Sequence, residues 1–336
     1  MLRDVYAVTD IGDDIDDHWA LSMLMVMPSV RLRLILCDSY SALARGDVLA
    51  EFLMQANISA VPIGIGVNRS GAGLIMKGYA QKGALARYAA RGGPVYDDGV
   101  EALIKLSADG LGPPLARPLP RPVLLVISPC PSLRAALQRE PRLGQRFDVF
   151  AMGGSVFHGL NASTPPQQEW NIKADPLAAE ALYHAPWPLD DAPLDTAGSA
   201  QIDGTAYGTL VRSARRFPLI AALLGAYRFW LPRCPWPDAT MQPLPANVSL
   251  RSSVLFDAVA VSMLPSFEAQ GGGPFLDTET LKLRVTRDGW TRPDPAGGGR
   301  PVRCALRWRR RGEWQAAVVD LLTGRTVGSD HNILEQ

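Results

Sequence analysis

Short apolar runs alternate with helical patterns through the first 150 residues, and this alternation most constrains the fold. The apolar runs lie at residues 5–10, 31–39, 61–67, 122–129 and 147–154, each bounded by Gly, Pro, Asp or Ser. Between them, residues 16–27, 44–56, 100–108 and 132–140 repeat apolar side chains at helical spacing. Such runs are typical of strands buried on both faces of a parallel sheet. We therefore predict an α/β fold with an open, mostly parallel sheet flanked by helices.

The rest of the chain is expected to extend the same unit. Residues 218–230 and the segment around Asp257 have helical patterns, and the tail stretches 281–289, 302–312 and 313–322 alternate like strands. We expect the tail to form a short β segment on the sheet edge. Length alone allows one large unit or two smaller ones. Because no repeat is visible and the Pro-rich residues 106–122 resemble a surface loop, we predict a single domain over residues 1–336.

Composition excludes several classes of function. The 336 residues are 47% hydrophobic and 20% charged, as in soluble globular proteins, and the net charge of +1 gives no field to attract nucleic acid or an anionic membrane. No apolar run approaches the roughly 18 to 20 residues that span a bilayer. The N-terminus also lacks a secretory signal, so we expect a cytoplasmic protein. The four cysteines are far apart, which argues against zinc and disulfides and predicts reduced, mostly buried thiols.

The most unusual segment is TDIGDDIDDHWAL at residues 9–21, directly after the first apolar run. We call its residues 10–17 the acidic loop, because they include five aspartates. Two carboxylates about 4 Å apart repel by about 4 kcal/mol at an effective dielectric of about 20. A helix N-terminus offsets only about 0.3 to 1 kcal/mol of this. Converging acids therefore indicate a hard divalent cation, Ca²⁺ or Mg²⁺, although acids that cap the helix and face water remain the alternative.

These residues resemble the nucleoside hydrolases, a family of Ca²⁺-dependent N-ribohydrolases. The acidic loop is similar to the family's N-terminal signature, in the variant with two more residues between the first Asp and the Asp-Asp pair. VISPCPSLRAAL at 126–137, the block at 150–182 and LFDAVAV at 255–261 are similar to three further family segments in the same order. The resemblance implies the family's Rossmann-like α/β core, an inosine/uridine-preferring type of chemistry and a homodimer or homotetramer.

The resemblance also assigns roles to individual residues. Asp10 and Asp17 would bind the metal with the carboxylate of Asp257 and the main-chain carbonyl of Pro131, and Asp10 would also be the general base. Asp14 lies in the two-residue expansion and has no certain counterpart, so its role is open between orienting Asp10 and the outer sphere of the metal. The remaining implied residues hold the sugar: Asp16 and Asn171 at ribose hydroxyls, and Glu169 and Asn161 at the 5′ side.

The side of the site that would face the base departs from the family. Many members carry a His before the late Asp that protonates the leaving base, whereas this chain has Phe256. A second branch has an aromatic residue there that stacks on a purine, which Phe256 fits loosely. Asp38 or Ser39 stands near the position of a sugar-binding Asn. Among the histidines, His158 lies in the loop that could reach the site, although a packing role is favoured for it.

The leading hypothesis is Ca²⁺-dependent hydrolysis of the N-glycosidic bond of a ribonucleoside, purine type favoured, or of a related N-ribosyl metabolite. Mg²⁺ is the less favoured ion. The alternative is a metal-dependent protein of the same fold that binds a ribosyl ligand with little or no catalysis. Either hypothesis predicts a small-molecule ligand and no nucleic acid or membrane as a partner.

Overall fold

A ten-stranded sheet forms the centre of the computed structural model, which describes residues 2–68, 74–109, 120–162, 165–235 and 247–325. The strands lie in the order β4-β3-β2-β1-β5-β6-β7-β10-β8-β9. Pairing is parallel from β4 through β7 to β10 and antiparallel in the last two pairs, which confirms the predicted mostly parallel sheet. The strands are β1 (Arg3–Thr9), β2 (Val30–Cys37), β3 (Ile63–Ile65), β4 (Val95–Tyr96), β5 (Val123–Ile127), β6 (Asp148–Ala151), β7 (Leu189–Asp191), β8 (Leu276–Val285), β9 (Thr291–Pro293) and β10 (Pro301–Trp308).

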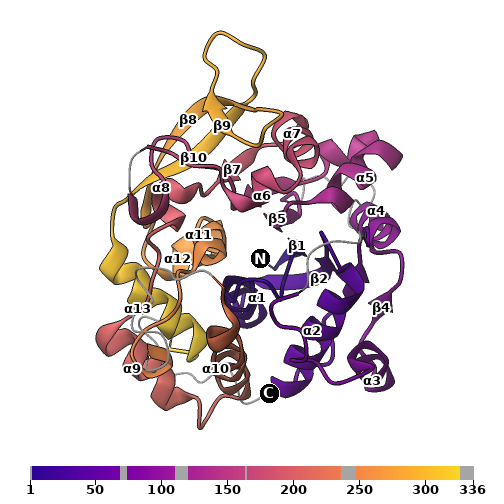
Figure 1. Cartoon of the computed structure of the whole chain (residues 1–336), viewed down its shortest axis with the longest axis vertical. Helices are drawn as coiled ribbons and strands as arrows, with labels where there is room; N and C mark the ends of the chain where they lie inside the picture. The colour runs from indigo at the N-terminus through magenta and orange to yellow at the C-terminus, as the bar shows by residue number, and fades with distance from the viewer. Residues whose placement is uncertain (1, 69–73, 110–119, 163–164, 236–246, 326–336) are drawn as a thin grey trace.

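Helices cover both faces of the sheet (Figure 1). The helical patterns predicted from the sequence form α1, α2, α4, α5 and α10. Three helices, α5, α7 and α10, begin with a proline, whose fixed φ and missing N–H suit the first helical turn. The predicted Pro-rich surface loop lies mostly outside the described residues. The helices are α1 (Asp16–Val26), α2 (Ala42–Gln55), α3 (Ala84–Ala90), α4 (Gly99–Asp109), α5 (Pro131–Arg139), α6 (Trp170–Lys173), α7 (Pro176–His184), α8 (Leu194–Ala197), α9 (Gly204–Ser213), α10 (Pro218–Trp230), α11 (Phe256–Ser262), α12 (Pro265–Gln270) and α13 (Arg311–Leu322).

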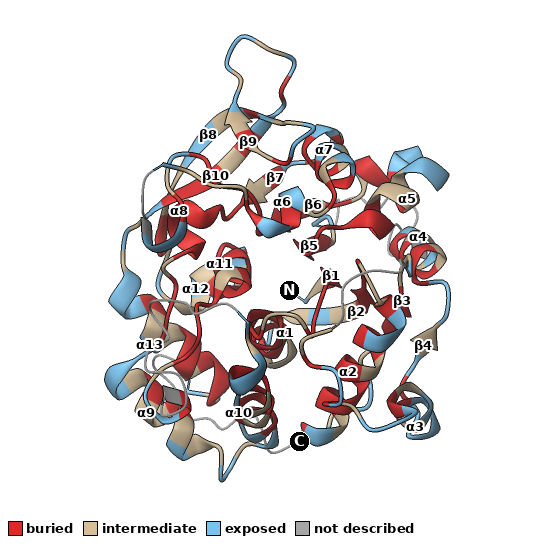
Figure 2. Ribbon diagram, in the orientation of Figure 1, coloured by how far each residue is buried: buried red, intermediate tan, exposed pale blue. Residues whose placement is uncertain are grey.

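The core has two layers, one on each face of the sheet. Side chains alternate along β1, so Val5 and Ala7 pack with α1, α2, α10 and α11, whereas Tyr6 and Val8 pack with α4, α5 and α7. Strand β5 is buried throughout, as a parallel strand between two helical layers must be. Figure 2 shows these buried central strands, with the exposed residues concentrated on the outer surfaces of the helices.

The C-terminal segment joins the sheet through β10 and β8 as predicted, but its last described element is a helix. The prediction of a strand-like stretch at 313–322 is wrong, because these residues lie in α13, where Trp314, Val318 and Leu321 are buried at helical spacing. Short apolar stretches do not by themselves distinguish a strand from a helix. The indole Nε1–H of Trp314 donates a 2.6 Å hydrogen bond to Ser262 Oγ, which ties α13 to α11.

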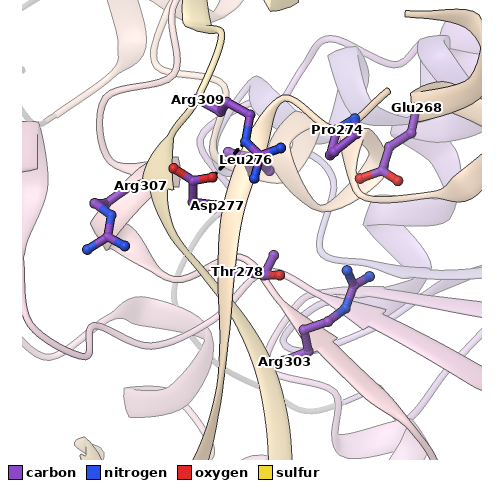
Figure 3. A pocket seen from close by; sticks show the side chains of 8 residues that line it. All are labelled: Glu268, Pro274, Leu276, Asp277, Thr278, Arg303, Arg307 and Arg309. Atoms are coloured by element: carbon purple, nitrogen blue, oxygen red, sulfur yellow. Dashed lines mark hydrogen bonds and ion pairs between the residues drawn. The ribbon is translucent and has the colours of Figure 1, made fainter. Parts of the chain in front are cut away.

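An open hollow of about 430 Å³ lies against β8 and β10 (Figure 3). Arg303, Arg307 and Arg309 line it, and each is already paired with a carboxylate, so the hollow has no unbalanced positive charge. None of the predicted site residues lines it.

No helix in the described ranges has the length and apolar character needed to cross a membrane. Cys37, Cys130 and Cys304 are buried and Cys234 is half-buried, which agrees with the prediction of mostly buried thiols.

Candidate active site

Three aspartates converge where the N-termini of two helices meet at the carboxyl end of the sheet. Asp16 and Asp17 lie in the first turn of α1, and Asp257 lies in the first turn of α11. One ligand oxygen from each lies within 4.8 Å of the others, and all three residues are at most 5% exposed. We call these residues the aspartate triplet. Figure 1 shows α1 and α11 side by side near the middle of the molecule, and the backbone N–H of Asp257 donates to Asp16 Oδ2 at 3.4 Å.

Burial of the aspartate triplet is electrostatically costly. Burial, followed by the charge of Asp10, raises the pKa of Asp16 from 3.8 to about 7. The pKa values of Asp17 and Asp257 are raised well above the usual range, first by burial and then by the neighbouring carboxylates. Partial compensation comes from Thr9, whose hydroxyl donates to Asp17 Oδ1. Burial and mutual repulsion thus disfavour the charged form of all three acids, and a bound cation would offset that penalty.

Asp10 follows β1 and lies beside the aspartate triplet rather than in it. Its side chain is buried, and burial raises its pKa to about 7, while the charge of Arg45 opposes that rise. The charge of Asp10 in turn raises the pKa of every member of the triplet. The expected ligands were Asp10, Asp17, Asp257 and the Pro131 carbonyl. In the structure, the carboxylate oxygens that converge belong to Asp16, Asp17 and Asp257, and the ligand role of Asp10 stays a prediction.

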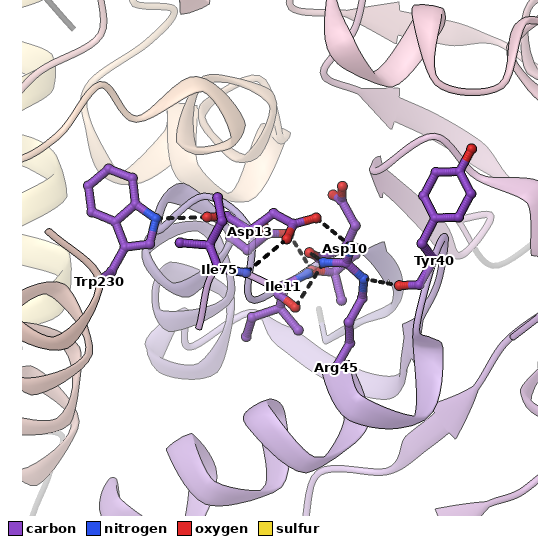
Figure 4. Close-up of polar contacts among 9 residues, drawn as sticks. Asp10, Ile11, Asp13, Tyr40, Arg45, Ile75 and Trp230 are labelled. Atoms are coloured by element: carbon purple, nitrogen blue, oxygen red, sulfur yellow. Dashed lines mark hydrogen bonds and ion pairs between the residues drawn. The ribbon is translucent and has the colours of Figure 1, made fainter. Parts of the chain in front are cut away.

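The other two carboxylates of the acidic loop have local partners. The carboxylate of Asp13 forms a 2.5 Å ion pair with Arg45, a buried arginine of α2 (Figure 4). Asp14 is half-buried, and its Oδ1 accepts a 2.6 Å hydrogen bond from the N–H of Ile15. Its charge contributes to the raised pKa of Asp257, so Asp14 lies near the triplet without belonging to it. The five aspartates of the acidic loop therefore divide into two that belong to the triplet, Asp10 beside it, and two with local partners in the loop.

Glu169 and Asn171 are held together at the start of α6. The Glu169 carboxylate accepts hydrogen bonds from the N–H groups of Gly154 (2.9 Å), Asn171 (2.8 Å) and Ile172 (3.2 Å). The side-chain amide of Asn171 donates to the Met152 carbonyl at 3.0 Å. Burial raises the pKa of Glu169 to about 7 despite these bonds, and the charge of Glu169 contributes to the raised pKa of Asp10. The predicted sugar-binding segment therefore lies close to the acidic loop.

Two expected residues lie at the ends of β2 and β5, the strands on either side of β1. Asp38 follows β2 and is fully buried, and its carboxylate accepts hydrogen bonds from Ser132, at 2.5 Å from the hydroxyl and 3.0 Å from the N–H. Pro131 is the buried first residue of α5 and follows Cys130, whose φ of 53° is in the left-handed region. The contact between Asp38 and Ser132 thus fixes the turn that presents the Pro131 carbonyl. The sugar-binding role of Asp38 stays a prediction.

The remaining expected residues lie at the edge of the site. Asn161 is exposed with a φ of 59°, and its N–H donates to the Gly198 carbonyl at 3.0 Å. Phe256 is half-buried beside Asp257 and packs partly against the apolar core. His158 is half-buried, and its Nδ1 has no hydrogen-bond partner among the described residues. Their predicted roles at the sugar and at the base stay predictions.

Sequence reasoning did not identify three residues that organise the site. Thr9 binds Asp17, and Arg45 binds the acidic loop. Asp195 accepts hydrogen bonds from the N–H groups of Val156 and Phe157, both at 2.9 Å, and so fixes the loop after the Gly-Gly pair. Thr9 directly precedes the first aspartate and offered a local signal. Arg45 and Asp195 lie in ordinary helical patterns and offered none.

The residues present fit a divalent cation. The aspartate triplet supplies only carboxylate oxygens, which hard cations such as Ca²⁺ and Mg²⁺ prefer, and its burial leaves the negative charge without water to solvate it. Among the described residues, the oxygens of the aspartate triplet lie close enough to one another to hold an ion. A cation would offset the same repulsion that raises the three pKa values.

A family model, inosine-uridine preferring nucleoside hydrolase, matches residues 5–292 of this chain. No curated protein sequence matches the chain.

Several solved structures share its fold. The chain is similar to a plant nucleoside hydrolase, PpNRh1, with a TM-score of 0.69, 17% identity and coverage of 96% of this chain and 99% of the other. It is similar to a purine-preferring ribonucleoside hydrolase from Gardnerella vaginalis, with a TM-score of 0.67, 17% identity and coverage of 96% and 99%. The type III effector XopQ, solved with adenosine diphosphate ribose, has a TM-score of 0.65, 16% identity and coverage of 97% and 95%.

Proposed function

Because the chain belongs to the inosine-uridine preferring nucleoside hydrolase family, we propose that it is a Ca²⁺-dependent N-ribohydrolase that favours purine nucleosides. The observation that carries this proposal is the aspartate triplet, which lies beside Asp10, and Asp10 is itself within electrostatic reach of Glu169. A buried acidic centre next to a polar segment suits a ligand that is rich in hydroxyls and whose reaction develops positive charge.

Asp16, Asp17 and Asp257 would hold the cation, with Asp10 and the Pro131 carbonyl completing the proposed ligand set. Ca²⁺ is preferred to Mg²⁺ because several carboxylates can surround a larger, more flexibly coordinated ion. Bound there, the cation would supply Lewis-acid chemistry and offset the charge of the acids. Asp14 would act from outside this set by shaping the loop.

Asp10 is the proposed general base. Its buried carboxylate would accept one proton from the attacking water, whose oxygen forms a bond to C1′ of the ribose as the C1′–N bond breaks. Asp16 and Glu169 would stabilise the positive charge that develops on the sugar ring. The electron pair of the broken bond leaves with the base, which takes up a proton, and the products are ribose and the free base.

The proposed sugar contacts are those implied by the resemblance to the family. Asp16, in the aspartate triplet, and Asn171, beside Glu169, would bind ribose hydroxyls. Glu169 and Asn161 would bind the 5′ side. Asp38 would act mainly through Ser132, because that hydroxyl already occupies its carboxylate.

Phe256 supports the preference for purines. It precedes Asp257 on α11 and is half-buried, where a ring could stack on the leaving base. A stacked aromatic pair contributes about 0.5 to 1.5 kcal/mol beyond its buried area. A purine presents a larger and more basic ring system than a pyrimidine, so it depends less on a dedicated acid.

The direct test is to incubate the protein with a panel of purine and pyrimidine nucleosides and measure free ribose, with calcium and with a chelator. We expect release of ribose from purine nucleosides that stops in chelator and returns when calcium is added. The Asp10→Asn variant should lose activity by about a hundredfold or more. Asp97→Asn, which changes an exposed acid, is the matched control and should behave as the wild type. Full activity in Asp10→Asn would remove Asp10 as the base.

A second candidate is a protein that binds a ribosyl ligand with little turnover. The fold shared with XopQ, solved with adenosine diphosphate ribose, and the Phe256 side chain in place of an acid favour it. Calorimetric binding of adenosine diphosphate ribose without release of ribose from any nucleoside would support this candidate. The proposed homodimer or homotetramer can be tested by light scattering in the same samples.

A further inference from the structure

Arg45 is an unusually buried arginine next to the general base. It lies in α2 with a side chain only 2% exposed, whereas arginines are almost never fully buried unless paired. Its Nε–H donates to the Tyr40 carbonyl at 2.7 Å. One terminal nitrogen donates to the carbonyls of Asp10 and, at 3.2 Å, Ile11, and the other donates to the Asp13 carboxylate at 2.5 Å (Figure 4). One guanidinium thus binds three main-chain oxygens and one carboxylate.

The same part of the acidic loop is held from two further sides. The indole N–H of Trp230, at the end of α10, donates to the Asp13 carbonyl at 2.7 Å. The N–H of Met76 donates to the Gly12 carbonyl at 2.9 Å. Gly12 has a φ of 110°, a conformation that other residues rarely adopt, so the turn depends on glycine. The loop between Asp10 and α1 is therefore fixed by contacts with residues distant in the sequence.

We propose that Arg45 is a positioning residue that, anchored on Asp13, sets the loop so that Asp10 and the aspartate triplet face one centre. Its contact with the Asp10 carbonyl fixes the main chain from which the general base projects. Its contact with Asp13 fixes the middle of the loop, after which α1 begins with Asp16 and Asp17. A planar fork with five donors can satisfy these acceptors together, whereas a lysine ammonium cannot.

This inference rests on the proposed function for its kinetic test but not for its structural one. Two simpler roles compete with positioning: supply of positive charge beside Asp10, and general stabilisation of the fold. Arg45→Lys tests the first role, the supply of charge, because lysine keeps the positive charge but lacks the planar guanidinium with its five donors. Arg146→Lys tests the second role, general stabilisation of the fold, because Arg146 is a similarly buried arginine on the α4 side of the sheet. Its side chain is 11% exposed, donates to the Ile104 carbonyl at 2.8 Å and pairs with Glu140.

The experiment compares the full-length wild type with Arg45→Lys, Asp13→Asn and the control Arg146→Lys. Calcium affinity is measured by titration calorimetry, kcat and KM by ribose release at saturating calcium, and loop order by amide hydrogen exchange of residues 9–17. For Arg45→Lys we expect calcium affinity and kcat each to fall by about tenfold or more, with a smaller change in KM. Hydrogen exchange in residues 9–17 should accelerate. Asp13→Asn should likewise lower calcium affinity and kcat and accelerate exchange. This variant keeps the proposal testable if Arg45→Lys fails to fold.

Arg146→Lys should lower thermal stability but leave calcium affinity, kcat and exchange in residues 9–17 within about twofold of the wild type. The proposal is overturned if Arg45→Lys keeps wild-type values, or if both lysine variants change kcat in proportion to their loss of stability. If the wild type releases no ribose, the proposed function fails, and calcium affinity and hydrogen exchange still decide the role of Arg45.

Discussion

Asp257→Asn should stabilise the calcium-free protein while it removes the stabilisation that calcium gives. The ligand oxygens of the aspartate triplet lie within 4.8 Å of one another, and at that distance two unit charges repel by about 3.5 kcal/mol at an effective dielectric of about 20. The rise of the Asp16 pKa from 3.8 to about 7 corresponds to about 4 kcal/mol. Desolvation by burial is the first cause of that rise and a neighbouring carboxylate charge adds to it, so the removal of one charge should recover only part of this free energy.

An asparagine at 257 has nearly the same shape and carries no charge. At pH 8 in chelator we therefore expect the free energy of unfolding to increase by about 2 to 4 kcal/mol relative to the wild type. At a calcium concentration about 100 times the dissociation constant, the wild type should gain about 2.7 kcal/mol, and the variant should gain little. The variant is thus expected to be more stable than the wild type in chelator but to gain less stability from calcium. Most mutations in a protein core do not produce this combination.

The assay is urea unfolding of both proteins in chelator and in calcium, followed by tryptophan fluorescence. Asp97→Asn, at an exposed site, is the matched control and should change neither value. The reasoning is refuted if Asp257→Asn is less stable than the wild type in chelator, or if calcium stabilises both proteins equally. Either result would mean that the acids do not repel one another around a shared ion.

Three further predictions concern pH, the sugar and the base. Because the pKa of Asp16 is raised in the folded state, this group destabilises the calcium-free fold least below about pH 4 and increasingly as pH rises toward 7. Urea unfolding midpoints should therefore fall over this pH range in chelator, and they should fall less in calcium. Glu169→Gln should raise KM in ribose assays, because the Gln side chain offers one acceptor oxygen where the carboxylate offers two to the N–H groups of Gly154, Asn171 and Ile172. Phe256→His should raise kcat/KM for pyrimidine nucleosides by about tenfold relative to kcat/KM for purine nucleosides, because the imidazole adds an acid that can protonate the leaving base. If the ratio of the two kcat/KM values is unchanged, residue 256 does not face the base.

The parallel core was predictable because its strands are buried on both faces. Runs such as residues 122–129 must be apolar throughout, and the helices between them repeat apolar residues at helical spacing. Strand β7 was missed because its sequence is Leu-Asp-Asp and its pairing comes from its neighbours β6 and β10. Residues 313–322 were misassigned because a short apolar stretch fits either period. Tertiary contacts decide such segments.

The candidate site was predictable where charge is concentrated in the sequence. Five aspartates beside an apolar run indicated a cation, and the resemblance to a family added Asp257 from a distant segment. The sequence did not show that Asp16 would join the converging group or that Asp13 would turn to Arg45. These outcomes depend on side-chain directions and on contacts between segments far apart in the chain, which no local pattern records.

The most direct test of the proposed cation site and reaction is a crystal structure of the protein grown with calcium and a ribosyl ligand. We expect an anomalous peak with oxygens of Asp16, Asp17 and Asp257 about 2.3 to 2.6 Å from it, and ribose hydroxyls on its open side. A structure at ample calcium with no ion between these side chains, and the ligand bound elsewhere, would contradict it.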